Sequence, residues 1–212
     1  MNRNSINLDP FNIKSCELTL PGSKSISNRV LLLSSLARGK TLIKNLLSSD
    51  DTAVMIIALK KLGIKIHENK ELQQCFVEGS VNSFPTKSAD LYIGNSGTTI
   101  RPLTAALAFN NGDYKLHGTN RMHQRPIKDL VDSLNQMGAK IEYLNQHGYP
   151  PIKINKASTN TNKANIKSNI SSQFLTSLIL SSTIFSKDKN FEICVDGNLI
   201  SKPYVNITLK LM

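Results

Sequence analysis

The chain has 212 residues, of which 40% are hydrophobic, so it can bury the core of one large domain or two small ones. No apolar run approaches the roughly 18 residues of a membrane helix, and residues 1–9 are too polar for a signal peptide. The formal charge of +11 raises nucleic-acid binding, but the lysines are scattered, and the aromatic residues, at 6%, do not alternate with a basic patch.

The three cysteines, Cys16, Cys75 and Cys194, are odd in number and far apart in the chain. This pattern suggests neither a disulfide framework nor a metal site, and the four histidines show no ligand spacing. We therefore expect a reducing, cytoplasmic location for the protein.

The first predicted helix follows a turn at Pro21 and Gly22 and a run of serines that also contains Lys24 and Arg29. Free N–H groups at the start of this helix, its dipole and the two cations together predict a site for a phosphate or a carboxylate. The alternative is a serine-capped helix that carries two solvated cations. This turn alone does not decide between the two interpretations.

Further elements follow in chain order. Helices are expected over 30–36, from 48 to 62, over 103–108, from 126 to 137, from 172 and from 201. Strands are expected over 40–44, 64–66, 74–78, 89–93, 113–117, 141–143 and 191–195. The segment 155–167 is polar and weakly patterned, so we expect a surface hairpin or loop there.

The same small, polar turn recurs at a fixed interval. Arg29, Arg101 and Gln173 are each 72 residues apart, and the turns 94–99 and 168–172 precede the second and third of them. Repetition at a fixed period indicates a repeated structural unit. We interpret the chain as three units of strand-helix-strand-helix-strand-strand, of which the third stops inside a helix, and we expect a fragment of a longer protein.

Arginine is rare in this lysine-rich chain, yet Arg29, Arg101, Arg121 and Arg125 all lie in or beside these turns. The planar guanidinium grips carboxylate and phosphate with two hydrogen bonds, which favours a binding role. A buried structural role remains the alternative for Arg101 and Arg121.

Five motifs in these turns resemble those of one family, 5-enolpyruvylshikimate-3-phosphate (EPSP) synthase, also called 3-phosphoshikimate 1-carboxyvinyltransferase. They are, in order, 20–29 (LPGSKSISNR), 94–102 (GNSGTTIRP), 125–127 (RPI), 171–175 (SSQFL) and 201–204 (SKPY). The resemblance implies an α/β (α+β) fold with a threefold βαβαββ repeat, its helices inside and its sheets outside. It also implies that 21–212 is an incomplete N-terminal domain, and that 1–20 carries a strand which pairs with a second domain.

By this resemblance, the complete enzyme transfers the enolpyruvyl group of phosphoenolpyruvate to the 5-hydroxyl of shikimate 3-phosphate and releases phosphate. The resemblance implies no metal, no organic cofactor, no nucleic acid or membrane partner, and a monomeric full-length enzyme. It also implies that the general base and the acid groups lie in the second domain. We therefore expect this chain alone to be catalytically inert.

The implied site residues follow from the same motifs. Lys24 contacts both substrates and acts electrostatically. The implied ligands of shikimate 3-phosphate are Lys24, Ser25, Arg29, Ser171, Ser172, Gln173 and Ser201. Those of phosphoenolpyruvate are Lys24, Gly97, Arg125 and Gln173, and secondary contacts are Asn95, Thr98 and Tyr204. Arg101 is expected to be structural, and Ser96 stands where some members of the family carry alanine.

Other interpretations remain open at this point. The related enolpyruvyl transferase that acts on UDP-N-acetylglucosamine often has a reactive cysteine in the loop equivalent to 118–124, where this chain has none. RNA 3′-phosphate cyclases share the repeat but lack these turns. A non-catalytic basic RNA-binding domain would bind polynucleotide with steep salt dependence. A degenerate remnant without function is the last alternative.

Overall fold

The computed structural model describes residues 6–7, 10, 15, 17–159, 161–167, 171–186, 190–199 and 201–212. Its helices are α1 (Lys24–Leu36), α2 (Asp50–Lys61), α3 (Gly97–Leu107), the 3-10 turn η1 (Met122–Gln124), α4 (Lys128–Gln136), α5 (Ser172–Ser186) and α6 (Lys202–Leu211). Its strands are β1 (Lys40–Ile43), β2 (Lys65–Asn69), β3 (Gln74–Glu78), β4 (Ser88–Tyr92), β5 (Asp113–His117), β6 (Lys140–Tyr143), β7 (Ile152–Asn155), β8 (Lys163–Lys167) and β9 (Glu192–Asp196).

The strands form three sheets whose connections repeat. The second sheet has the order β4-β5-β7-β6, in which β4 and β5 are parallel and the remaining pairs are antiparallel. The first sheet, β1-β3-β2, repeats the antiparallel part, and the parallel pair β8-β9 repeats the β4-β5 part. The second unit is thus a full βαβαββ unit, and the fold class predicted from the sequence is confirmed.

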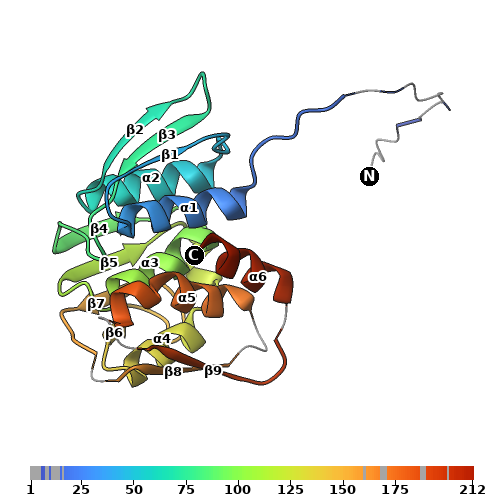
Figure 1. Cartoon of the computed structure of the whole chain (residues 1–212). Helices are drawn as coiled ribbons and strands as arrows, with labels where there is room; N and C mark the ends of the chain where they lie inside the picture. Colours follow the sequence, from blue (N-terminus) through green and yellow to red (C-terminus); the bar gives the residue numbers. More distant parts are fainter. Residues whose placement is uncertain are drawn as a thin grey trace.

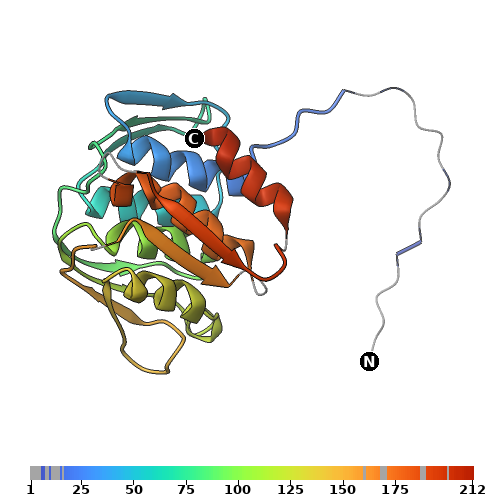
Figure 2. The same cartoon turned by 60° about the horizontal axis from the view of Figure 1, so that its bottom comes forward.

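The first helix of each unit lies in the interior, and the sheets form the periphery (Figures 1 and 2). Helix α3 is buried along almost its whole length and packs against α5. Its Ala105, Ala106 and Leu107 are each fully shielded from solvent. Its buried polar side chains are paired, since Thr104 bonds to the carbonyl of Ile100 and Arg101 bonds to Gln173 and Pro126. Helix α3 can therefore be covered on every side, which explains why it occupies the centre.

The structure differs from the sequence-based expectations in three places. The segment 155–167 is not a loop throughout, because β8 spans Lys163–Lys167 and pairs in parallel with β9. Only Ala164 and Ile166 of this strand are buried, so the polar residues between them hid the strand pattern. In addition, α4 begins at Lys128 rather than at Pro126. No range was predicted for β7, although the repeat implies a second strand after α4.

The small, polar turns that recur along the sequence are partly helical. Helix α1 begins at Lys24 and α3 at Gly97, earlier than the apolar runs of the sequence indicate. The motif residues therefore occupy the first turns of these helices, where backbone N–H groups have no partner within the helix. Residues 168–170 of the third turn lie outside the described residues.

Residues 17–20 form neither helix nor strand, and Leu18 and Leu20 are mostly exposed. The chain leaves the body of the domain at the start of α1 (Figure 1). The pairing of this segment with a second domain stays a prediction.

Candidate functional site

The N-termini of α1, α3, α5 and α6 face one cleft of about 510 Å³. The start of a helix presents unpaired N–H groups and the positive end of the helix dipole. Four such ends around one cleft make a strong binding site for anions. The turns predicted from the repeat therefore lie together rather than on different sides of the molecule.

All twelve residues that the sequence predicts for the site line this cleft. They are Lys24, Ser25, Arg29, Asn95, Gly97, Thr98, Arg125, Ser171, Ser172, Gln173, Ser201 and Tyr204. The structure thus brings every candidate to one place, and their individual roles stay predictions. One further residue, Asp51 at the start of α2, also lines the cleft and was missed by the sequence analysis.

Arg29 is a buried and anchored cation. Its side chain donates from Nε to Thr208 Oγ1 at 2.8 Å and from Nη1 to the carbonyl of Ser25 at 2.9 Å. Burial lowers its pKa, and the ring of Tyr204 lies 6.0 Å from its guanidinium carbon. These contacts fix the guanidinium before any ligand binds, which reduces the ordering cost of binding.

Lys24 contrasts with Arg29, because its side chain is 49% exposed. Its Nζ lies 3.5 Å from Asp51 Oδ2. A long, exposed side chain in an ion pair of this kind is held weakly. Lys24 is therefore the cation of the cleft that can move onto a ligand.

Arg125 reaches the cleft from the loop after η1, and its Nη1 donates to the carbonyl of Asn95 at 2.8 Å. Its guanidinium lies against Gly97, where a Cβ atom would come within 2.6 Å of Arg125 Nη2 and 2.9 Å of Arg101 Nη1. Real Cβ atoms do not approach other atoms this closely. Glycine at position 97 is therefore required for the guanidinium and the start of α3 to lie side by side.

Arg101 is structural, as expected, in the sense that it does not line the cleft. Its guanidinium donates to Gln173 Oε1 and to the carbonyl of Pro126, and it stacks on Phe174. Burial, followed by the nearby charge of Arg125, lowers its pKa to about 10. It ties α3 to α5 and orients Gln173.

Arg121, by contrast, is exposed, and its Nη1 donates a hydrogen bond to Gln124. The alternative of a buried structural role for Arg121 is therefore wrong.

Asp51 links the starts of three helices. Its Oδ1 accepts from Ser96 Oγ at 2.7 Å and from Thr98 Oγ1 at 3.0 Å, and Thr98 Oγ1 in turn accepts from Asn28 Nδ2 at 2.8 Å. Burial acts to raise the pKa of Asp51, but the bonds from Ser96 and Thr98 and the charge of Lys24 together lower it. Asp51 therefore stays ionised. An acidic residue in the first turn of a helix usually only complements the helix dipole, and Asp50 has the same position. Nothing in the local sequence therefore marked Asp51, rather than Asp50, as a residue of the cleft.

The serines of the cleft differ in how they are engaged. Ser171 Oγ accepts from the N–H of Gln173 at 3.2 Å and so caps α5, while Ser172 is buried. Ser201 adopts a left-handed backbone conformation (φ 55°) at the start of α6 and makes no capping bond with its side chain. Ser201 is one of the residues that line the cleft.

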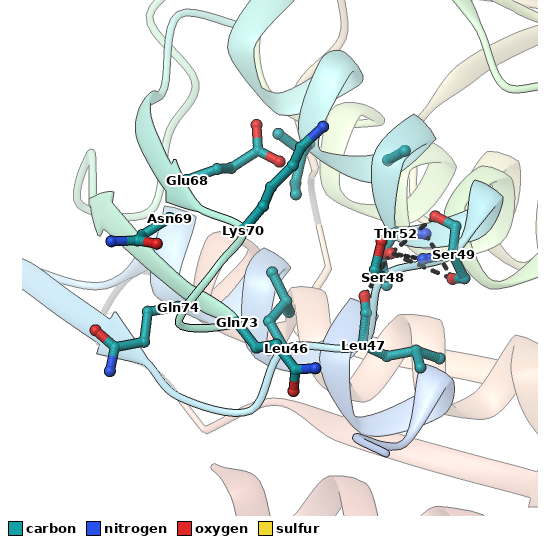
Figure 3. Close-up of a pocket in the computed structure, with 12 residues that line it drawn as sticks. Leu46, Leu47, Ser48, Ser49, Thr52, Glu68, Asn69, Lys70, Gln73 and Gln74 are labelled. Carbon is teal, nitrogen blue, oxygen red and sulfur yellow. Dashed lines mark hydrogen bonds between the residues drawn. The ribbon is translucent and has the colours of Figure 1, made fainter.

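A second cavity lies between the start of α2 and the β2–β3 hairpin (Figure 3). The start of α2 is already satisfied there, because Ser49 and Thr52 form a reciprocal capping box. Glu68, which lines this cavity, forms an ion pair with Lys60 at 2.8 Å. This cavity therefore lacks the open N–H groups and the converging cations of the cleft, and we do not assign the chemistry to it.

The described part of the chain contains no group of three His, Cys, Asp or Glu side chains that could hold a metal ion. Within the same residues, no helix is long and apolar enough to cross a membrane. Cys75 is buried and Cys194 is half-buried, and both are free thiols, whereas Cys16 lies outside the described residues.

Comparison with known proteins identifies related chains. The family model described as EPSP synthase (3-phosphoshikimate 1-carboxyvinyltransferase) matches residues 11–212. The 3-phosphoshikimate 1-carboxyvinyltransferase of Janthinobacterium sp. (strain Marseille) is 53% identical over 91% of this chain and 44% of its own length. The protein of the same name from Paraburkholderia phytofirmans is 51% identical over 98% of this chain and 48% of its own length.

A solved structure agrees with these relatives. The EPSP synthase of Acinetobacter baumannii superposes with a TM-score of 0.71 and 26% identity, over 77% of this chain and 37% of its own. The chain thus spans about half the length of the curated relatives that it matches. With a matching family model over nearly the whole chain, the chain belongs to the EPSP synthase family.

Proposed function

We propose that this chain forms the shikimate 3-phosphate-binding part of an enzyme that transfers the enolpyruvyl group of phosphoenolpyruvate to the 5-hydroxyl of shikimate 3-phosphate, with release of phosphate. The setting is aromatic amino-acid biosynthesis in the cytoplasm, by a monomeric enzyme. The observation that supports this most directly is the convergence of all twelve predicted residues on one cleft. The family match supports the reaction over that on UDP-N-acetylglucosamine.

The charge of the cleft suits the two substrates. Each substrate carries one phosphate and one carboxylate. Among the described residues, Lys24, Arg29 and Arg125 line the cleft against one carboxylate, that of Asp51. The helix N-termini add partial positive charge without adding a group that must be desolvated separately. We assign shikimate 3-phosphate to the side of Arg29 and the serines of α5 and α6, and phosphoenolpyruvate to the side of Gly97 and Arg125.

Lys24 would act between the two substrates. Its exposed ammonium can leave Asp51 and neutralise the charge of both anions, while the anchored Arg29 holds its ligand in a fixed register. Among the described residues, Asp51 is the one carboxylate that lines the cleft, and it already accepts two hydrogen bonds. It is therefore a poor general base, and we expect the isolated chain to bind shikimate 3-phosphate weakly and to give no turnover.

Calorimetric titration of this chain with shikimate 3-phosphate tests the proposal. Lys24→Ala should weaken binding about tenfold or more, because a charge-assisted hydrogen bond is lost. Lys65→Ala is the matched control, since Lys65 is an exposed lysine on β2 outside the cleft, and it should leave the affinity within about twofold.

Equal affinities for the native chain and Lys24→Ala would contradict the assignment of the cleft. Arg29→Lys offers a second test that keeps the charge but removes the two-nitrogen grip, and it should also weaken binding. Turnover by the isolated chain, measured as the release of phosphate, would overturn the expectation that it is inert.

A further inference from the structure

The start of α3 differs from those of its neighbours in how its serine is used. Ser23 accepts from the N–H of Ile26 in α1, Ser49 caps α2, and Ser171 caps α5. Ser96 stands at the same place before α3 in an extended conformation (φ −84°, ψ 96°) that suits capping. It nevertheless makes no capping hydrogen bond with its side chain.

The hydroxyl of Ser96 is held elsewhere. It donates its single proton to Asp51 Oδ1 at 2.7 Å, and its oxygen lies 2.8 Å from the hydroxyl of Thr99. A hydroxyl has one proton, so donation to the carboxylate fixes its rotamer and leaves Thr99 as the donor of the second bond. Asp51 thus pulls the capping group of α3 away from the backbone.

The N–H group that such a cap could reach is left free. No residue in the described ranges accepts a hydrogen bond from the backbone N–H of Thr98, the second residue of α3, whereas Ser171 accepts from the N–H of Gln173 at the same position of α5. Thr98 lines the cleft. An unsatisfied N–H at a shielded helix start has a free-energy cost unless a ligand or water accepts from it.

We propose that Asp51 is a positioning residue that withholds Ser96 from capping α3, and so keeps the N–H group of Thr98 open for an anionic substrate. The inference rests on the proposed function of the cleft. It explains why a carboxylate lies in a site for anions, where its own charge opposes binding. It assigns Asp51 no contact with the reacting atoms.

Amide hydrogen exchange, measured by NMR without any ligand, tests the proposal on this chain. Asp51→Ala should release Ser96 to cap the helix, and exchange at Thr98 or Thr99 should slow about fivefold, the usual strength of such a cap. Asp51→Asn should keep the native rate, because its side-chain oxygen still accepts from Ser96. Adding Ser96→Ala to Asp51→Ala should restore the native rate.

Two further variants make the result decisive. Asp50→Ala removes an exposed acid from the same helix end without touching Ser96, and should leave exchange at Thr98 and Thr99 unchanged. Ser96→Ala alone should also leave it within about twofold, whereas loss of an ordinary cap would speed it about fivefold. This last variant keeps the proposal testable if Asp51→Ala does not fold. The proposal would be overturned if Asp51→Ala exchanged at the native rate. It would also be overturned if exchange stayed slow after Ser96→Ala was added to Asp51→Ala.

Phosphoenolpyruvate binding provides the second measurement. In the Asp51→Ala chain, adding Ser96→Ala should tighten binding about fivefold, because the competing cap is removed. If Asp51 served only as a counter-ion for Lys24, the added change would have no effect. If no variant binds phosphoenolpyruvate, the proposed function fails. The exchange rates remain an independent test of the role of Asp51.

Discussion

A methyl group at position 97 offers a sharp test of how the cleft holds its cations. In Gly97→Ala the new Cβ would lie 2.6 Å from Arg125 Nη2, where about 3.5 Å is an ordinary contact. Arg101 cannot yield, because it is buried and bonded to Gln173 and Pro126. The guanidinium of Arg125 must therefore retreat by about 0.9 Å, which breaks its 2.8 Å bond to Asn95.

Gly97→Ala should lower stability as well as affinity. Alanine is favoured over glycine in a helix by up to about 1 kcal/mol, but the new Cβ would also lie 2.9 Å from Nη1 of the fixed Arg101. Overpacking of this kind costs about 1–3 kcal/mol, so the free energy of unfolding should fall by about 1 kcal/mol. Displacement of Arg125 removes a charge-assisted contact to the ligand, worth about 1.5 kcal/mol, or roughly tenfold in affinity. Calorimetry should show this loss for phosphoenolpyruvate, with shikimate 3-phosphate changed by less than about twofold.

A double-mutant cycle separates this mechanism from a general disturbance of α3. In the Arg125→Ala chain, Gly97→Ala should have little further effect on phosphoenolpyruvate affinity, because the group that it displaces is already absent. Unchanged phosphoenolpyruvate affinity in Gly97→Ala would refute the reasoning. So would an equal loss of affinity in both backgrounds.

Two more predictions follow from buried polar groups. Asn110→Ala should lower the free energy of unfolding in urea by about 3 kcal/mol, because Asn110 accepts from the N–H of Phe84 and donates to Tyr114 Oη in the core; a loss below about 1 kcal/mol would contradict this. The pKa of Asp51 is lowered in the folded state, so its stabilising effect is complete above the unfolded pKa of about 4 and is lost as the pH falls through the folded value. Acid unfolding should therefore cost the native chain more stability than Asp51→Asn, and parallel pH profiles would disprove the lowered pKa.

Local sequence patterns predicted the strands and helices whose burial alternates simply. Strands β3 and β5 match the expected ranges 74–78 and 113–117. Strand β8 was missed because only Ala164 and Ile166 turn inward, and the exposed positions carry Lys163, Asn165 and Lys167. Its strand character comes from pairing with β9, which lies about 30 residues later in the chain. No short window contains that information.

The amino-acid sequence alone was enough to predict the repeat and, from five motifs, the family, because turns that begin helices can be recognised in short stretches of chain. The resemblance to that family then implied the twelve residues that line the cleft. The packing of the helices set which neighbours these residues have. It turned Arg101 away from the cleft onto Phe174, and it brought Asp51 to Ser96, 45 residues further along the chain. Such contacts depend on how α1, α2, α3 and α5 pack, and packing between distant segments leaves no periodic or local mark in the chain.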